Sequence, residues 1–248
     1  MLSKEPLVSI ITASYNSEKT ITDSIESVLN QTYSNIQYII VDGLSKDRTV
    51  EIARSYETQF AEKGYQFTVI SEKDKGIYDA MNKGIRMAKG KIIGMINSDD
   101  WYEVNAAERV VDIYIKSNFE FFYADIRLVK GNRNRIKKSK IRKYATSRDW
   151  NHPTTFIVKE LYQKYQYRTE GLYSDFDLWL RARKDGHKIV VLNEVLANFR
   201  FGGVSNQKSL NKVFERMKER YHIYVDNGYS RWYLLECIVI EGVKLLIA

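Results

Sequence analysis

The residues with the most informative spacing are Asn-Ser-Asp-Asp at positions 97–100, which follow directly on the apolar run 92–96. An apolar run of that length, bounded by polar residues, is typical of a buried strand. Carboxylates at the carboxyl end of such a strand can hold a hard divalent cation and, through the cation, a phosphate group. The same residues would equally cap a helix that begins after Trp101, and the motif alone does not decide between a metal site and a cap.

The elements around this motif are predicted to bring other polar residues to it. Strand and helix patterns alternate along the first hundred residues, which indicates βαβ units and a mainly parallel sheet. The carboxyl ends of parallel strands share one edge of the sheet, so Tyr15, Asp42, Asp74 and Asp99 should converge on one crevice. The predicted strands are 7–12, 36–41, 66–71 and 92–96, and the predicted helices are 18–30 with Ser17 as its cap, Asp47 or Thr49 to 63, and 76–89.

The pattern after Trp101 also predicts alternating helices and strands. Residues 130–143 predict an exposed hairpin or mobile loop, and Pro153 limits residues 150–158 to an edge or bent strand. The expected fold class is therefore α/β, with a mainly parallel central sheet flanked by helices and further helices at the C-terminal end. The other predicted elements are helices at 103–117, 159–165, 174–184, 206–225 and 232–248, a strand at 119–129, and a long strand or strand pair at 188–199.

The composition is that of a globular protein with a basic excess. The 248 residues carry a formal net charge of +8, much of it within residues 130–143, which predicts attraction to anions. The one cysteine, Cys237, excludes a disulfide within the chain and fits a reducing compartment. The sequence gives no sign of a signal peptide or a transmembrane helix, so we expect a cytoplasmic location.

Two segments are candidates for contact with a membrane at its inner face. Residues 130–143 lack the interleaved aromatic side chains of single-stranded nucleic-acid binders, so no nucleic acid is expected and an anionic membrane or lipid diphosphate fits better. The helix predicted at 232–248 adds apolar bulk, but its charged residues Glu236, Glu241 and Lys244 do not gather on one helical face. Whether that helix meets a membrane, the sheet or a partner chain stays open.

Several stretches, taken in order, resemble the family 2 glycosyltransferases of the GT-A fold. They are SIITASYN at 9–16, VDGLSKDRT at 41–49, DKGIYDAMNKG at 74–84 and INSDDWY at 96–102. The resemblance continues loosely to about residue 205, and GIYDAMNKG is similar to a bacterial polysaccharide and colanic-acid-type branch. It implies an inverting, metal-dependent, hexosyltransferase-type enzyme. Such an enzyme transfers a sugar from a nucleotide-diphosphate sugar to a hydroxyl of a glycan or lipid-linked acceptor in bacterial surface polysaccharide synthesis.

The resemblance also divides the chain and assigns its residues. It implies a GT-A domain at 1–205, with a nucleotide-sugar half at 1–101 and an acceptor half at 102–205, and a helical extension at 206–248. The donor would be a UDP-sugar in preference to a GDP-sugar, with Mg²⁺ or Mn²⁺ at Asp99. The residues assigned to the donor are Ala13, Tyr15, Asn16 and Asp42 at the base, Lys75 and Asn82 at the diphosphate and sugar, Asn97 and Ser98 within the D-x-D position, and Arg200, in the glycine-rich loop 199–205, at phosphate. Asn97 stands where the family has a carboxylate, so it can bond ribose but adds no charge.

An inverting transfer needs one base to take the proton of the acceptor hydroxyl. Asp175 and Asp177 are the candidates, and Ser174–Asp175 would also serve as a helix cap. The segment SDFDLW at 174–179 resembles the family's E-D-x-x-L-W motif, which favours Asp175, although Ser174 replaces the glutamate. His152 is either an acceptor contact, as the resemblance implies, or a structural residue.

Two other classes of protein remain alternatives. A nucleotidyltransferase would share the α/β scaffold and the metal carboxylates, but the stretch after the first predicted strand lacks a glycine-rich, basic phosphate loop. A non-enzymatic anion-binding protein would explain the charge but not the converging carboxylates.

Overall fold

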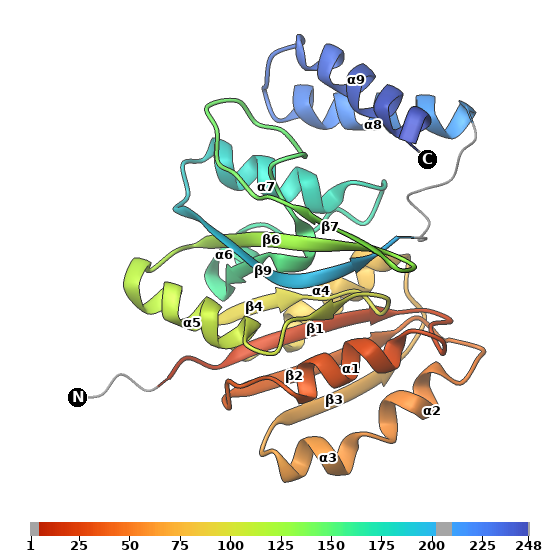
Figure 1. Cartoon of the computed structure of the whole chain (residues 1–248), viewed down its shortest axis with the longest axis vertical. Coiled ribbons are helices and arrows are strands. Elements are labelled where there is room, and N and C mark those ends of the chain that lie inside the picture. Colours follow the sequence, from red (N-terminus) through yellow and green to blue (C-terminus); the bar gives the residue numbers. More distant parts are fainter. Residues whose placement is uncertain (1–4, 202–209, 248) are drawn as a thin grey trace.

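The β-branched apolar runs form one mixed sheet, and the amphipathic segments form the helices that cover it. The computed structural model describes residues 5–201 and 210–247. Within these residues the sheet has nine strands in the order β3-β2-β1-β4-β8-β6-β9-β5, with β7 paired to β6 (Figure 1). The strands are β1 (Val8–Ser14), β2 (Ile36–Asp42), β3 (Gln66–Ser71), β4 (Ile92–Met95), β5 (Trp101–Tyr102), β6 (Phe121–Lys130), β7 (Arg133–Lys137), β8 (Phe156–Val158) and β9 (Ile189–Arg200). The helices are α1 (Ile21–Leu29), α2 (Thr49–Arg54), α3 (Glu57–Glu62), α4 (Ile77–Met87), α5 (Ala106–Ser117), α6 (Lys159–Lys164), α7 (Ser174–Lys184), α8 (Leu210–Asp226) and α9 (Tyr233–Ile247), with the 3₁₀ turn η1 (His152–Thr154).

The first four long strands are parallel, as the sequence predicts. Strands β3, β2, β1 and β4 run in one direction, and their register puts Ser14, Asp42 and Ser71 side by side at the carboxyl edge. Strand β8 joins this parallel half to β6 through antiparallel pairing on both of its sides. Strand β9 is parallel to β6, so the sheet is mixed but mainly parallel, and the predicted fold class is confirmed.

Alternating side chains of the central strands enter two separate hydrophobic clusters. Ile11 and Ile39 belong to the cluster that includes α4 and α7, whereas Ile10 and Tyr38 belong to the cluster that includes α1 and α5. A strand directs successive side chains to opposite faces, so helices must cover both faces of a sheet whose strands are apolar throughout. Both faces of the central strands are therefore covered.

Two predicted helices differ from the observed ones at their ends. Helix α1 begins at Ile21 with Thr20 as its cap residue, so the predicted cap at Ser17 is wrong. The hydroxyl of Ser17 instead bonds with that of Ser98 at 2.7 Å. The long helix predicted to reach residue 63 is two short helices, α2 and α3, because the chain turns at residues 55–56.

The interpretation of the aspartate pair as a helix cap is also wrong. The chain after Asp100 forms strand β5, which pairs with β9, and α5 begins only at Ala106 with Asn105 as its cap residue. A carboxylate six residues before a helix cannot accept from the N–H groups of its first turn. The alternative, a ligand site at the sheet edge, therefore remains for Asp99.

Strand β8 is not the predicted edge strand. Pro153 lies in η1, ahead of the strand, so it removes no donor from the ladder. The strand itself is buried and lies between β4 and β6. The predicted exposed hairpin is confirmed, since β7 pairs with β6.

Helices α8 and α9 form an antiparallel pair beyond α7, on the side of the sheet away from α1 (Figure 1). Asn227 at the end of α8 donates to Asp177 Oδ1 in α7 at 2.7 Å, which ties the pair to the main body. The glycine-rich part of the predicted loop 199–205 and the predicted domain boundary after residue 205 lie outside the described residues. Within the described residues, no helix is long and apolar enough to cross a bilayer.

Candidate active site

Asp42 is the centre of a hydroxyl network at the carboxyl edge of the parallel strands. Its side chain is fully buried and accepts hydrogen bonds from Ser14 Oγ at 3.2 Å, Ser71 Oγ at 2.7 Å and Ser45 N at 2.9 Å. The hydroxyl of Ser45 also donates to it. A buried carboxylate is tolerated where donors satisfy both oxygens. Asp42 therefore fixes the turns after β1 and β2, while its predicted contact with a base stays a prediction, because protein donors occupy both oxygens here.

The turn after β1 is held against the turn after β2. Asn16 has a φ of 50°, a left-handed conformation that Asn adopts more readily than most residues. Its N–H donates to Ser45 Oγ and its Oδ1 accepts from Lys46 N, both at 2.8 Å. Ala13 is buried within β1, whereas Tyr15 is 59% exposed and free to stack on a flat ligand. The predicted convergence of the turns at one edge is confirmed, and the role in base binding stays a prediction.

The carboxyl end of β4 brings two aspartates into contrasting surroundings. Asp100 is fully buried, and its Oδ1 accepts from Arg200 N at 3.0 Å. Burial raises the pKa of Asp100 well above its usual range, and the charge of Asp99 raises it further. Burial also raises the pKa of the half-buried Asp99, although Arg200 opposes that rise. Burial and proximity thus disfavour the charged form of both carboxyls, and a bound cation would favour that charged form instead.

The residues at the carboxyl end of β4 could bind a divalent cation together with a bound ligand. Asn97 Oδ1 is buried, and no hydrogen bond from the described residues reaches it. Among the described residues, no group of three or more His, Cys, Asp and Glu could hold a metal unaided. Mg²⁺ usually keeps few protein ligands, often one or two carboxylates together with substrate phosphates. Asp99, with the unbonded Asn97 Oδ1 two positions earlier in the chain, therefore suits a metal that a diphosphate helps to bind.

The start of α4 lies at the same edge. A Cβ atom at Gly43 would be 2.5 Å from Asp74 Oδ2, so Asp74 packs against the turn after Asp42, as the topology predicts. Lys75 is exposed beside it. Asn82 is buried, and both ends of its amide are used: Nδ2 donates to Tyr167 O at 2.8 Å and Oδ1 accepts from Tyr167 N at 3.0 Å. Asn82 thus joins α4 to the segment before α7. Its predicted contact with the sugar donor stays a prediction.

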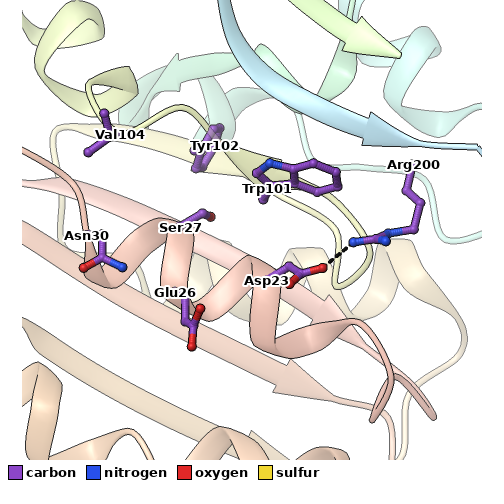
Figure 2. A pocket seen from close by; sticks show the side chains of 8 residues that line it. All are labelled: Asp23, Glu26, Ser27, Asn30, Trp101, Tyr102, Val104 and Arg200. Carbon is purple, nitrogen blue, oxygen red and sulfur yellow. Dashed lines mark hydrogen bonds and ion pairs between the residues drawn. The ribbon is translucent and has the colours of Figure 1, made fainter. Parts of the chain in front are cut away.

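Arg200 lines a pocket of about 480 Å³ between α1 and β5. Its guanidinium is paired with Asp23, donates from Nε to Asp99 O at 3.1 Å, and lies 4.9 Å from the centre of the Trp101 ring (Figure 2). Among the described residues that line this pocket, Arg200 alone belongs to the predicted donor set. Its role as a phosphate clamp stays a prediction, and that role would require the guanidinium to leave Asp23.

The two candidate bases have different surroundings. Asp177 is buried and bonded to Arg181 Nε at 2.9 Å, to Arg168 Nε at 3.3 Å and to Asn227. Asp175 is only partly buried, and its Oδ1 accepts from the hydroxyl of Tyr78 and from Phe176 N. No hydrogen bond from the described residues reaches its Oδ2. Asp177 is therefore tied into the packing of α7, and Asp175 has an oxygen available to a ligand.

Tyr78 is a site residue that the sequence analysis did not single out. Its hydroxyl lies 2.9 Å from both Asp175 Oδ1 and Leu172 O, and its ring stacks on Tyr167. Tyr167 in turn lies 3.3 Å from His152 Nε2. Burial lowers the pKa of His152, and the charge of Asp175 opposes this. The sequence signal was present in the GIYDAMNKG stretch, but a tyrosine in a helical pattern is indistinguishable from a core residue.

Comparison with known proteins identifies the family. Residues 9–174 match the family described as Glycosyl transferase family 2. The chain belongs to this family. It is 30% identical to the UDP-Glc:alpha-D-GlcNAc-diphosphoundecaprenol beta-1,3-glucosyltransferase WfgD of Escherichia coli, over 96% of this chain and 94% of that protein. It is 28% identical to the O-antigen biosynthesis glycosyltransferase WbnJ of Escherichia coli, over 84% of this chain and 85% of that protein.

Solved structures of glycosyltransferases share the fold. The structure of S. aureus TarS in complex with UDP has a TM-score of 0.67 and 16% identity, over 94% of this chain and 69% of that chain. The mannosyltransferase PcManGT of Pyrobaculum calidifontis, in complex with GDP-Man and Mn²⁺, has a TM-score of 0.69 and 14% identity, over 98% of this chain and 73% of that chain.

These findings confirm the family 2 membership and the GT-A fold that the ordered motifs predict. This glycosyltransferase has relatives that act in bacterial polysaccharide and O-antigen synthesis. The nucleotidyltransferase and the non-enzymatic anion-binding alternatives do not agree with that membership. The colanic-acid-type branch is not tested separately and stays a prediction.

Proposed function

We propose that this family 2 glycosyltransferase transfers a sugar, with inversion, from a UDP-sugar to a hydroxyl of a lipid-linked or glycan acceptor. Asp175 takes the proton of that hydroxyl while its oxygen attacks the anomeric carbon. The bond from that carbon to the diphosphate oxygen breaks, and the nucleoside diphosphate leaves. A base positioned for this proton is needed because a neutral hydroxyl is a weak nucleophile.

The observation that carries the proposal is the bond between Asp175 and Tyr78. Tyr78 is in the first turn of α4, directly after the carboxyl end of β3 and the loop that holds Asp74. The base candidate is therefore tied to the same edge of the sheet as Asp42 and Asp99, although it comes from the other half of the chain.

Asp99 and Asn97 would hold Mg²⁺ or Mn²⁺ together with the donor diphosphate. A cation bound there would neutralise the charge that develops on the departing diphosphate. The buried, unbonded oxygen of Asn97 and the position of Asp99 at the carboxyl end of β4 support such a site. Tyr15 would stack on the base, and Ser14, Ser45 and Ser71, ordered by Asp42, would surround it.

The preference for uridine rests on relatives whose names state their ligands. WfgD is named for UDP-Glc and a diphosphoundecaprenol acceptor, and TarS has been crystallised with UDP, whereas PcManGT was solved with GDP-Man. A polyprenyl diphosphate sugar is accordingly the acceptor class we propose. The cytoplasmic location at the inner face of a membrane stays a prediction that fits such an acceptor.

The test begins with calorimetric titration of UDP and GDP into the intact protein, with Mn²⁺ and then with EDTA. We expect UDP to bind more tightly than GDP, and EDTA or Asp99→Ala to weaken binding at least tenfold. A panel of UDP-sugars with a GlcNAc-diphospholipid then tests transfer. Binding of neither nucleotide, or UDP affinity indifferent to both EDTA and Asp99→Ala, would contradict the proposal.

A further inference from the structure

The exposed side chains of α9 over residues 233–242 form an apolar face. Five large apolar side chains lie on it, including Trp232 just before the helix at 79% exposure and Leu235 at 57%. At 100° per residue, residues 232, 234, 235, 238 and 239 fall within one arc of less than half the helix circumference. The set is Trp232, Leu234, Leu235, Ile238 and Val239.

Two carboxylates of the same helix, Glu236 and Glu241, contact α8. Glu241 is 1% exposed and bonded to Arg216 Nε at 3.0 Å and Arg220 at 3.5 Å, both on α8. Glu236 lies 3.4 Å from the hydroxyl of Tyr224, also on α8. The sequence shows only that the charges are spread around the helix. The structure shows that Glu241 is buried against α8 and that Glu236 is partly buried at the border of the apolar face.

A basic rim adjoins this apolar face. A pocket of about 390 Å³ is shared between Leu235 and Val239 of α9 and the chain segment 142–149. Arg142, Tyr144 and Arg148 line its other side and are exposed. Two carboxylates line it as well: the buried Asp149, which pairs with Arg142 at 2.9 Å, and Glu236. The segment is held in place by bonds to the helix pair, because Ala145 N donates to Tyr233 Oη at 2.9 Å and Arg220 donates to Ser147 Oγ at 2.6 Å. Further exposed residues of this segment are Lys140, Ile141 and Lys143.

We propose that this combined surface, the outer face of α9 with the rim at 140–148, docks on an anionic lipid bilayer. Exposed apolar side chains beside cations match the interface of such a membrane, where acyl chains lie beneath anionic headgroups. Trp232 and Tyr144 are side chains of the type that prefers the headgroup level. The inference deepens the proposed function, because a lipid-linked acceptor lies at a bilayer, but vesicle binding can be tested without any substrate.

A second copy of the chain matches this surface less well. A two-fold interface through α9 would bring the same patch of both copies together. The rim of one copy, with Arg142, Lys143 and Arg148, would then approach the rim of the other. Cations brought together in this way repel each other, whereas an anionic bilayer attracts both rims.

Vesicle co-sedimentation of the full chain tests the proposal. Vesicles of phosphatidylcholine with about a third phosphatidylglycerol should bind the protein at least tenfold more tightly than pure phosphatidylcholine, and salt should weaken the binding. The double variant Leu235→Glu/Val239→Glu should lose binding at least tenfold. Lys143→Gln/Arg148→Gln should lose most of the preference for anionic vesicles.

The matched control is Ile115→Glu, since Ile115 is an equally exposed apolar residue on α5, away from α9 (Figure 1). It should bind vesicles as the unaltered chain does. UDP titration of each variant checks that the variant is folded. It also keeps the proposed function separate from the docking surface, because the proposed donor site lies at the carboxyl ends of β1, β2 and β4 and not on α9. Absence of vesicle binding, or equal binding by the double variant and Ile115→Glu, would overturn the inference. The inference would also be overturned if analytical sedimentation showed that the unaltered chain is a dimer and that the double variant is a monomer.

Discussion

At the scale of single residues, Asp175 and Asp177 are two positions apart in α7, on opposite sides of the helix, and we expect them to have separate roles. We expect Asp175→Asn to reduce kcat by about 10²–10⁴-fold, because it removes a general base. The affinity for UDP should stay within a few-fold, because Asp175 contacts no predicted base or diphosphate residue. Steady-state transfer assays with calorimetry of UDP measure both quantities.

Asp177→Asn is the control for that prediction. It leaves Arg181 and Arg168 without a buried carboxylate, so it should lower the free energy of unfolding by about 3 kcal/mol or more. The residual folded enzyme should keep its base. Transfer rates per folded molecule that fall as far as in Asp175→Asn would contradict the assignment of the base.

Tyr78 is expected to position Asp175. Tyr78→Phe keeps the ring that stacks on Tyr167 but removes the hydroxyl bonded to Asp175 Oδ1. We expect kcat to fall roughly tenfold, since a misplaced base loses part of its contribution, with the KM for donor little changed. Tyr78→Ala should lower kcat further, because it also removes the ring and so lowers the stability of the folded protein. An unchanged kcat in Tyr78→Phe would show that Asp175 does not depend on this bond.

His152 should contribute to the pH dependence of stability. Burial lowers its pKa in the folded protein, so the unfolded chain binds the proton more readily. As the pH falls through about 6.5, the unfolded state gains protons first, and the free energy of unfolding decreases. Urea denaturation at about pH 7.5 and pH 5.5 should show a larger loss for the unaltered chain than for His152→Gln. Equal losses would argue against a depressed pKa.

At the scale of elements, the sequence predicts most of what local patterns determine. The strand at 66–71 and the helix at 174–184 have the predicted bounds. Strand β5 was missed because two residues carry no periodicity. Strand β8 was misjudged because the place of Pro153 in a 3₁₀ turn depends on tertiary packing.

The candidate site was predictable only in part for a related reason. The topology alone brings Asp42, Asp74 and Asp99 to one edge, since parallel strands share their carboxyl ends. The tie between Asp175 and Tyr78 joins residues 97 positions apart, and no local pattern indicates it. The ion pair between Arg200 and Asp23 is likewise set by tertiary packing, so the sequence pattern does not predict it.

The junction between β4 and β8 depends on a glycine. A Cβ at Gly94 would be 2.3 Å from Phe156 Cε1, its partner across the two strands. Gly94→Ala should therefore lower the free energy of unfolding by about 1–3 kcal/mol through overpacking. Gly242→Ala, in a helix with open space around it, should instead raise it by about 0.5–1 kcal/mol. Chemical denaturation measures both, and a neutral Gly94→Ala would show that the ring can move aside.

At the scale of the whole molecule, the helix pair α8–α9 is held to the rest through polar contacts. Arg220 reaches Ser147, Asn227 reaches Asp177, and Tyr224 donates to Ala145 O at 3.2 Å. Side chains from both helices also enter the cluster that contains α7. Within the pair, Glu241 of α9 is buried between Arg216 and Arg220 of α8, and Arg220 in turn reaches Ser147, so this network joins the two helices to each other and to the segment 142–149.

Glu241→Gln tests this connection. It removes the carboxylate that faces Arg216 and Arg220, both nearly buried, so the free energy of unfolding should fall by about 3–5 kcal/mol. The matched control is Glu160→Gln, whose exposed pair with Lys91 at 2.8 Å should contribute less than about 1 kcal/mol. Urea denaturation gives both values, and hydrogen exchange should report the loss first in α8 and α9. If the two substitutions cost the same, the buried network does not hold the helix pair, and the outward apolar face of α9 would have to be kept in place by its other contacts.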